Sequence, residues 1–191
     1  LAQPSGKKIV ILHTNDLHSH ITGYAPESDY TPMTVNDDDT RGGFARIASI
    51  FNEEKGSGDE ITLILDGGDF LMGTLFQGME LTTGYQLRLM KEMGYDVVAI
   101  GNHEFDWGPD KLAEIINSSA GGGEIPQLLL SNALFDPDDQ ADDRLAALYD
   151  EEIIAKKTVL EREGVKIGFF SILGKVADSN AAFAPPVTFA D

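Results

Sequence analysis

Polar side chains that can bind a metal ion follow three separate apolar runs of the chain. The runs are residues 9–12, 61–65 and 96–100. The groups that follow them are carboxylates, imidazoles and an amide: Asp16, His18, Asp69, Asn102 and His103. In an open parallel sheet the carboxyl ends of the strands share one edge, and ligands bind in the crevice there. We therefore expect the three segments to bring these side chains to one place.

A divalent cation would explain such a gathering. Unpaired carboxylates that share a crevice repel one another and raise each other's pKa, so packing alone gives no reason for them to meet. The chain has no Cys, which excludes disulfides, thiol catalysis, iron–sulfur clusters and thiolate zinc sites. Oxygen and imidazole ligands suit zinc, manganese or iron, and ligand type alone does not choose among them.

Several of these residues also have ordinary structural explanations. A single His near a strand end is more often structural than functional, and here the combination carries the argument. Gly67-Gly68 and Gly101 would let the backbone turn sharply beside Asp69 and Asn102, or they are simple tight turns. Asp106 could serve the start of a helix near Pro109, where Asp is favoured.

Apolar runs alternate with amphipathic stretches along the chain, which predicts an α/β fold with βα crossovers on a mostly parallel sheet. The first two strands read as buried throughout, and a fourth strand is expected at residues 127–130. Helices are expected at 44–51, ended by the Gly56–Gly58 cluster, at 83–93, ended by Gly94, and from Pro109 onward.

The remaining segments predict a late hairpin and three irregular stretches. The hairpin joins residues 154–162 and 165–172 around Glu163-Gly164. Residues 23–43 form a long loop, 136–143 an acidic surface loop, and 178–191 a tail without a regular period.

Charge and length limit the classes of function. The 191 residues include 32 Asp plus Glu and 14 Lys plus Arg, a formal net charge of −18. This argues against a nucleic-acid scaffold as partner, because phosphate neutralisation needs Lys and Arg. It also slows the approach of anionic nucleotides unless metals or local basic residues reverse the field. No apolar run approaches the roughly 20 residues that span a bilayer, and the length suits one domain or part of a larger one.

The ordered motifs resemble those of a known family. Asp16-x-His18, then Gly68-Asp69, then Gly101-Asn102-His103-Glu104, each after a strand, are similar to the signature of calcineurin-like metallophosphoesterases. The longer sequence segments at residues 11–18 and 101–106 resemble the 5'-nucleotidase branch of that family. Further similarity at 42–46, 131–133 and 164–168 extends the resemblance over nearly the whole chain.

The resemblance implies two-metal hydrolysis of phosphomonoesters, with nucleotides as the substrates. Asp16 and His18 would bind the first ion, Asn102 the second, and Asp69 would bridge the two. His103 would stabilise charge on the phosphoryl oxygens or protonate the leaving alkoxide.

The resemblance further implies that Asp106 orients the His103 ring. We assign no ligand role to Asn15 or Asn132, which read as turn residues, and none to His13 or His20, which read as supporting or surface groups. We assign no chemical role to Glu104, and we identify no substrate-binding residue.

The family pattern continues with further His ligands, but no His follows His103 in this sequence. The resemblance therefore implies that residues 1–191 are the N-terminal part of one metallophosphatase domain, an α/β/β/α sandwich, without the C-terminal nucleotide-binding domain. We expect incomplete metal sites and little activity alone. An apolar sheet face would be exposed, which favours self-association or a companion segment. The alternative is a shortened relative that has lost catalysis.

The same motifs are compatible with other functions. A cyclic-nucleotide phosphodiesterase, a nucleotide-sugar hydrolase or a sulfur-ester hydrolase would share them, and so would a non-catalytic binding protein on the same scaffold. By resemblance the compartment is periplasmic or extracellular.

Overall fold

Five parallel strands form the central sheet of the computed structural model, which describes residues 6–24, 40–55 and 60–190. Their order in the sheet is β1-β2-β3-β4-β6, and every neighbouring pair is parallel. The strands are β1 Lys8–Thr14, β2 Glu60–Asp66, β3 Val97–Ala99, β4 Gln127–Leu129 and β6 Ile154–Ala155. The α/β class predicted from the alternating pattern is confirmed.

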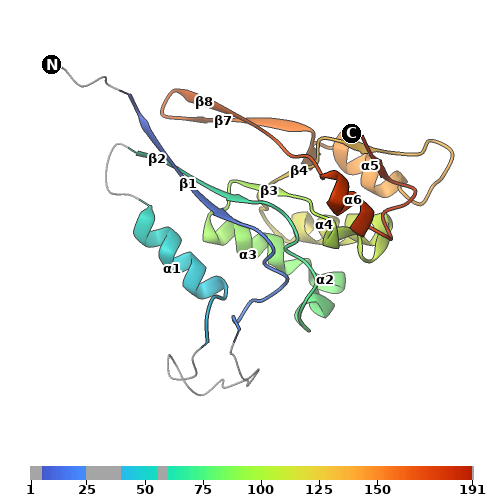
Figure 1. Ribbon diagram of the computed structural model, residues 1–191, viewed down its shortest axis with the longest axis horizontal. Coiled ribbons are helices and arrows are strands. Elements are labelled where there is room, and N and C mark those ends of the chain that lie inside the picture. Colours follow the sequence, from blue (N-terminus) through green and yellow to red (C-terminus); the bar gives the residue numbers. More distant parts are fainter. Residues whose placement is uncertain (1–5, 25–39, 56–59, 191) are drawn as a thin grey trace.

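Helices connect the parallel strands and cover one side of the sheet. They are α1 Phe44–Glu54, α2 Gln77–Thr83, α3 Tyr85–Met93, the 3₁₀ turn η1 His103–Phe105, α4 Gly108–Gly122 and α5 Asp143–Asp150. A further helix, α6 Lys175–Asn180, follows later in the chain and connects no parallel strands. Strand order follows chain order, so right-handed crossovers send successive helices to the same face. Figure 1 shows α1, α3 and α4 along that side. None of the described helices is both long and apolar enough to cross a membrane.

The core lies between the sheet and these helices. Ile64 and Val98 of the strands pack in one buried cluster with Met90, Leu112 and Ile116 of the helices. Burying each such side chain stabilises the fold by about 1.5–3 kcal/mol. The core thus fixes where each strand ends, and with it the loops that follow.

The predicted hairpin is present on the other side of the sheet (Figure 1). It consists of β7 Lys157–Arg162 and β8 Val165–Phe170, and the turn residues Glu163 and Gly164 have φ of +51° and +78°. Two successive positive φ angles are typical of a tight hairpin turn. Residues 154–155, predicted as the start of this hairpin, instead form β6 and pair with β4.

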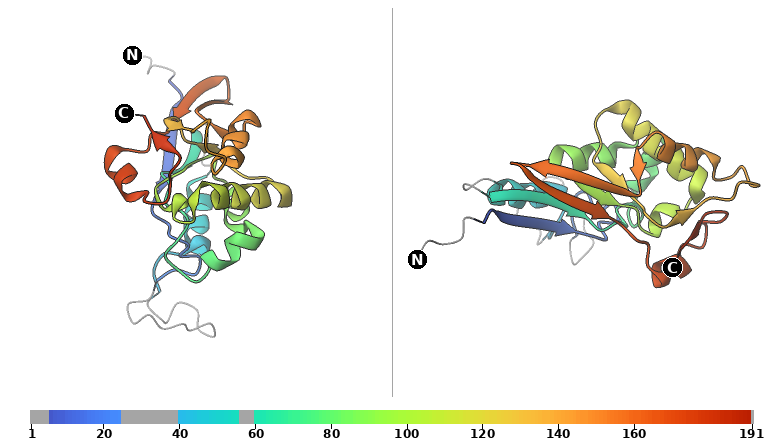
Figure 2. Two further views of the ribbon diagram at one scale, coloured as in Figure 1. Left: turned by 90° about the vertical axis from the view of Figure 1, so that its right-hand side faces the viewer. Right: turned by 90° about the horizontal axis from the view of Figure 1, so that it is seen from above.

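The expectation that the first strand is fully buried is wrong. Burial alternates along β1, and Ile9 and Ile11 are 42% and 58% exposed. The reason is that β1 is an edge strand, and its second face points away from the helices. Val159 and Phe170 of the hairpin are also exposed. Figure 2 shows β1 at the margin of the sheet, with the hairpin over only part of it.

Two other segments differ from the sequence prediction. The helix expected at 83–93 begins at Tyr85, because Gly84, at φ +52°, separates it from α2. A side chain at Gly84 would place its Cβ 2.6 Å from the carbonyl oxygen of Ile115 in α4. The tail expected to be irregular at 178–191 includes the end of α6, and its strand β9 Thr188–Phe189 pairs with β5 Ala133–Leu134. Because β9 is short and pairs with a strand far away in the sequence, no periodic hydrophobic pattern in the tail reveals it.

Parts of two predictions lie outside the described residues. These are residues 25–39 of the long loop and the Gly56–Gly58 helix stop. The described ends of the loop meet, since Tyr24 and Arg41 exchange two backbone hydrogen bonds of 2.8 Å. The acidic stretch is exposed at residues 136–141, as predicted, whereas Asp142 is buried.

A buried network joins β1 and β2 just below the edge where the loops emerge. The Thr14 hydroxyl donates to Asp66 Oδ2 at 2.6 Å and lies 2.7 Å from the Tyr95 hydroxyl oxygen. The Gly68 N–H donates to Asp66 Oδ1 at 2.9 Å. Burial is the main cause that raises the pKa of Asp66 from 3.8 to about 6.

This raised pKa predicts a pH-dependent stability. Between pH 4 and 6 the unfolded chain loses the Asp66 proton while the folded chain keeps it, so stability falls as pH rises across this range. Asp66→Asn should remove up to about 3 kcal/mol of that fall. Urea unfolding of both proteins from pH 4 to 7 measures it. An identical pH slope in the variant and the parent would contradict the prediction.

Candidate metal centre

Three side chains from three loops meet at the carboxyl edge of the sheet. His18 follows β1, Asp69 follows β2 and His103 follows β3, and one potential ligand atom of each lies within 4.8 Å of the others. The His18 and His103 ring centroids are 4.9 Å apart. Two ligands of one ion, with bonds of about 2.0–2.2 Å, lie at most about 4.4 Å apart. Imidazole and carboxylate donors at this spacing fit a divalent ion after small side-chain adjustments.

The other predicted site residues lie beside this cluster. Asp16 Oδ1 is 3.7 Å from His18 Nε2, and the Asp16 side chain is 56% exposed. Asn102, directly after the third strand segment, is 8% exposed, and its carbonyl accepts the Phe105 N–H at 3.1 Å. The cluster therefore shares His18 and Asp69 with the predicted ligand set and adds His103, to which the resemblance assigns catalysis.

A ladder of backbone hydrogen bonds holds the first two loops together. Gly67 N donates to Thr14 O at 2.8 Å, and Asp16 N donates to Gly68 O at 3.0 Å. His18 N then donates to Asp69 O at 3.0 Å. These bonds continue the β1–β2 pairing past the strand ends, so the segment containing Asp16 and His18 is fixed beside Asp69.

The same loops hold several residues in a strained backbone conformation. Positive φ angles of 45° to 57° occur at four non-glycine positions of the first two loops: Asp16, His18, Ser19 and Asp69. Each costs of order 1–3 kcal/mol and persists only where the surroundings impose it. The ladder and the apolar anchors Phe70, Leu71 and Phe105, at 0–1% exposure, supply that constraint. Such strain gathers where side-chain direction matters to function.

Close packing, rather than an ordinary turn, accounts for the glycines of the second and third loops. A Cβ on Gly101 would lie 2.6 Å from the Asp69 nitrogen and 2.9 Å from Asp69 Cγ. A Cβ on Gly68, at φ +100°, would lie 2.7 Å from the Gly101 nitrogen. Only glycine at both positions lets Asp69 approach the third loop.

Asp106 contacts the ring of His103. The His103 Nδ1 lies 2.8 Å from Asp106 Oδ2, and this hydrogen bond is the main cause that raises the pKa of His103. Helix α4 begins at Gly108 and has no side-chain cap, so the Asp106 carboxylate faces the imidazole and does not cap the helix. With Nδ1 engaged, Nε2 is the ring nitrogen left for other chemistry.

The residues that received no ligand role lie outside the cluster. Asn132 donates to the carbonyls of Leu173 and Ala190, at 3.1 and 2.8 Å, and so ties β5 to the tail. The His20 ring packs edge-on against Tyr24, with centroids 6.3 Å apart. Asn15 donates to the Asp16 carboxylate.

Sequence reasoning missed Glu104. Its side chain is 1% exposed and accepts backbone hydrogen bonds from Asp69, Leu71 and Gly101. Burial raises its pKa to about 8. The one signal in the sequence was its place directly after His103, and that place does not reveal which way the side chain points.

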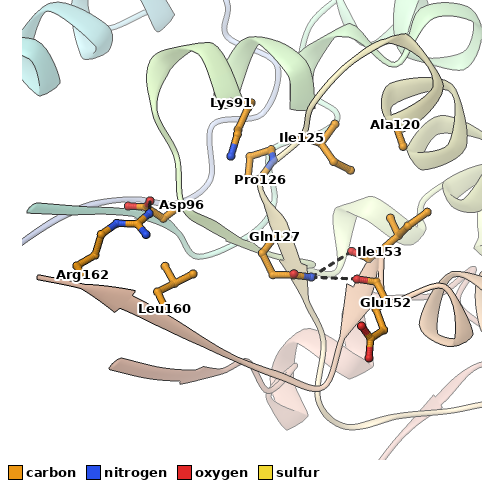
Figure 3. Close-up of a pocket in the computed structure, with 10 residues that line it drawn as sticks. All are labelled: Lys91, Asp96, Ala120, Ile125, Pro126, Gln127, Glu152, Ile153, Leu160 and Arg162. Atoms are coloured by element: carbon orange, nitrogen blue, oxygen red, sulfur yellow. Dashed lines mark hydrogen bonds and ion pairs between the residues drawn. The ribbon is translucent and has the colours of Figure 1, made fainter. Parts of the chain in front are cut away.

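A pocket of about 350 Å³ lies at the opposite edge of the sheet, near the amino ends of β3 and β4 (Figure 3). Two of its four charged side chains pair with each other. Arg162 forms an ion pair with Asp96 at 2.9 Å, which ties the hairpin to β3. The Gln127 amide donates to the carbonyls of Glu152 and Ile153. This pocket holds the sheet and hairpin together, and the metal-binding groups are at the other edge.

Comparisons with known proteins match this chain to one family and one fold. A family model described as calcineurin-like phosphoesterase matches residues 9–167. The 5'-nucleotidase of Bos taurus is 34% identical over 111 residues, 56% of this chain and 18% of that protein. A snake venom 5'-nucleotidase of Gloydius brevicauda is 35% identical over 105 residues, 53% of this chain and 16% of that protein.

A solved structure also resembles the chain. The 5'-nucleotidase precursor from Thermus thermophilus matches with a TM-score of 0.70 and 24% identity, over 95% of this chain and 31% of that chain. The chain thus corresponds to less than a third of the length of each of these relatives. The resemblance that the motifs indicate is confirmed.

The packing at Gly101 predicts the effect of a single methyl group. Gly101→Ala should push Asp69 away from the third loop and destabilise the fold by about 1–3 kcal/mol, because a Cβ there overlaps Asp69. Gly168→Ala is the matched control, since its Cβ would meet no atom within 4 Å. Urea unfolding measures both variants. Equal stability of the two would contradict the packing argument.

Proposed function

The chain belongs to the calcineurin-like phosphoesterase family, and on that premise we propose that it supplies the metal-binding part of a hydrolase of phosphomonoesters, with nucleotides as substrates. The observation that carries the proposal is the meeting of His18, Asp69 and His103 at one edge of the sheet. The likeness to 5'-nucleotidases supports the choice of nucleotides.

We place residues 1–191 in the N-terminal part of one metallophosphatase domain. The share of the Thermus thermophilus chain that is matched, 31%, supports this placement. Ligands from further along such a domain would complete the metal sites, and a separate domain would hold the nucleoside.

Two divalent ions, of zinc, manganese or iron, fit the donor chemistry of the site. In the proposed assignment Asp16 and His18 would hold the first ion, Asn102 would hold the second, and Asp69 would contribute to both. When bound, such ions lower the pKa of water towards about 7 and neutralise charge on the phosphoryl oxygens. The carboxylates then gain a counter-charge that the −18 chain lacks.

His103 and Asp106 would carry the proton chemistry. The Asp106 carboxylate accepts a hydrogen bond from the His103 Nδ1–H and so fixes the ring and stabilises its cationic form. The Nε2–H of that cation can donate to a phosphoryl oxygen or pass its proton to the leaving alkoxide. A raised pKa keeps the ring protonated closer to neutral pH, as a general acid requires.

A non-catalytic binding protein on this scaffold is the alternative from a different class. A cyclic-nucleotide phosphodiesterase, a nucleotide-sugar hydrolase and a sulfur-ester hydrolase are the alternatives among enzymes. The His103–Asp106 pair favours an enzyme, because the raised pKa of His103 favours the protonated ring, which can act as a proton donor, whereas a metal ligand must be neutral. We also propose an exported protein, periplasmic or extracellular, which the likeness to a venom 5'-nucleotidase supports.

Hydrolysis by the natural protein that contains this chain tests the proposal. With Mn²⁺ or Zn²⁺ it should release phosphate from a nucleoside monophosphate, and His103→Ala should lower kcat by roughly 10²- to 10⁴-fold. Residues 1–191 alone should bind metal weakly and turn over little, because the ligand sets are incomplete.

His20→Ala is the matched control, because His20 is in the same segment as His18 but packs against Tyr24. It should leave kcat unchanged. Full activity of the His103→Ala variant would overturn the enzyme proposal, and normal turnover with two ions bound by residues 1–191 alone would overturn the domain assignment.

The exposed apolar residues of β1 and the hairpin predict that residues 1–191 self-associate, or that a further segment covers these residues. Ile11 and Phe170 are 58% and 71% exposed. Sedimentation equilibrium at micromolar concentration should show dimers or larger species, which Phe170→Glu should dissociate. Leu75→Glu is the control, because Leu75 is 97% exposed and lies in the loop before α2, outside the sheet and the hairpin. A stable monomer before substitution would count against the prediction.

A further inference from the structure

We propose that Glu104 is a positioning residue that locks the loops carrying Asp69 and Asn102 into one rigid unit. The functional role of this link rests on the proposed function, because the linked groups would hold metal. The link itself is inferred from the hydrogen bonds of Glu104 alone. The side chain is buried, at 1% exposure.

Three backbone N–H groups from two loops converge on this one carboxylate. Glu104 Oε2 accepts from Gly101 at 2.6 Å and from Asp69 at 2.9 Å, while Oε1 accepts from Leu71 at 2.9 Å. Two of the donors belong to the loop after β2 and one to the loop after β3. One side chain therefore spans both loops.

The two loops need such a link because strand pairing ends before them. The β2–β3 register stops at Asp66 and Val98, three residues before Asp69 and three before Gly101. Beyond this point the strand pairing supplies no acceptors between the two described segments, and buried N–H groups without partners destabilise a fold. The Glu104 carboxylate takes over the role of the missing strand pairing.

The link extends to the groups of the metal centre. Asp69, whose N–H is held by Glu104, accepts the His103 N–H on Oδ1 at 2.9 Å. His103 precedes Glu104 in the chain, so the contacts close a ring from Glu104 to Asp69 to His103 and back. Moving Glu104 must shift Asp69 relative to Asn102 and His103 together.

Both the acceptor atoms and the length of the side chain matter. Both side-chain oxygens of Glu104 accept hydrogen bonds from the two loops, whereas the amide of Gln would turn an N–H donor towards at least one of the three N–H groups. Asp is one methylene shorter and cannot reach both loops from the same backbone position. Glu104→Gln and Glu104→Asp thus disrupt the link in two different ways.

Glu80 is a matched control within the same chain. Its side chain is 0% exposed, accepts one backbone hydrogen bond, from Gln86 at 2.9 Å, and has a pKa raised by burial. That bond joins α2 to α3, and Glu80 reaches the loop after β2 only through Gln86, whose side chain donates to the Phe70 carbonyl. Glu80→Gln therefore reproduces the chemical change and the burial without a direct link between the two loops.

Amide hydrogen exchange of the metal-free protein tests the link directly. In the parent the N–H groups of Asp69, Leu71 and Gly101 should be as protected as those of β2. In Glu104→Gln the His103 N–H, which does not contact Glu104, should exchange at least tenfold faster relative to the β2 amides. A general loss of stability would speed all of these amides alike, and so would not change this ratio.

Binding of Mn²⁺ to the natural protein, measured by calorimetry, gives a second readout. Glu104→Gln should weaken Kd at least tenfold, and Glu104→Asp should not restore it, while Glu80→Gln keeps the parental Kd. Unprotected amides in the parent, or a His103 exchange ratio in Glu104→Gln equal to that in Glu80→Gln, would overturn the inference. The protection of these amides in the parent tests the inference even if the variants do not fold.

Failure of the inference and failure of the proposed function are distinguishable. A parent that binds no Mn²⁺ but has three protected amides would refute the metal centre and retain the link. A parent that binds Mn²⁺ and hydrolyses nucleotides, with exchange and Kd unchanged in Glu104→Gln, would retain the function and refute the link.

Discussion

The convergence of three loops on Asp69 is the constraint on which the site depends. The Asp69 carbonyl accepts from His18 of the first loop, and its carboxylate accepts from His103 of the third. Its own N–H donates to Glu104. One residue is thus bonded to every segment that contributes to the cluster, and the glycines at 68 and 101 let those segments come so close.

The local cost of this arrangement is met by the rest of the fold. Left-handed backbone at Asp16, His18 and Asp69 is unfavourable for side chains with a Cβ, and acids placed near each other raise one another's pKa. The parallel sheet and the buried Phe70 and Phe105 hold these segments in place. A cation would remove the remaining repulsion, which gives the strained geometry a chemical purpose.

Local sequence pattern predicted the parallel strands and the place where they end, because burial and β-branching are visible residue by residue. It predicted that Asp16, Asp69 and Asn102 would meet, since parallel strands share an edge. It did not predict the exposure of Ile11, because the edge position of β1 depends on the order of strands in the sheet. It also missed Glu104 and the pairing of β9 with β5, since both depend on contacts between distant segments.

The most direct test of the account is where a paramagnetic ion binds. Substoichiometric Mn²⁺ added to the isotopically labelled natural protein broadens NMR signals within a short radius of the ion. The account predicts selective loss of the signals of Asp16, His18, Asp69, Asn102 and His103. Broadening confined to another acidic region, such as the exposed stretch 136–141, with these five signals intact, would contradict it.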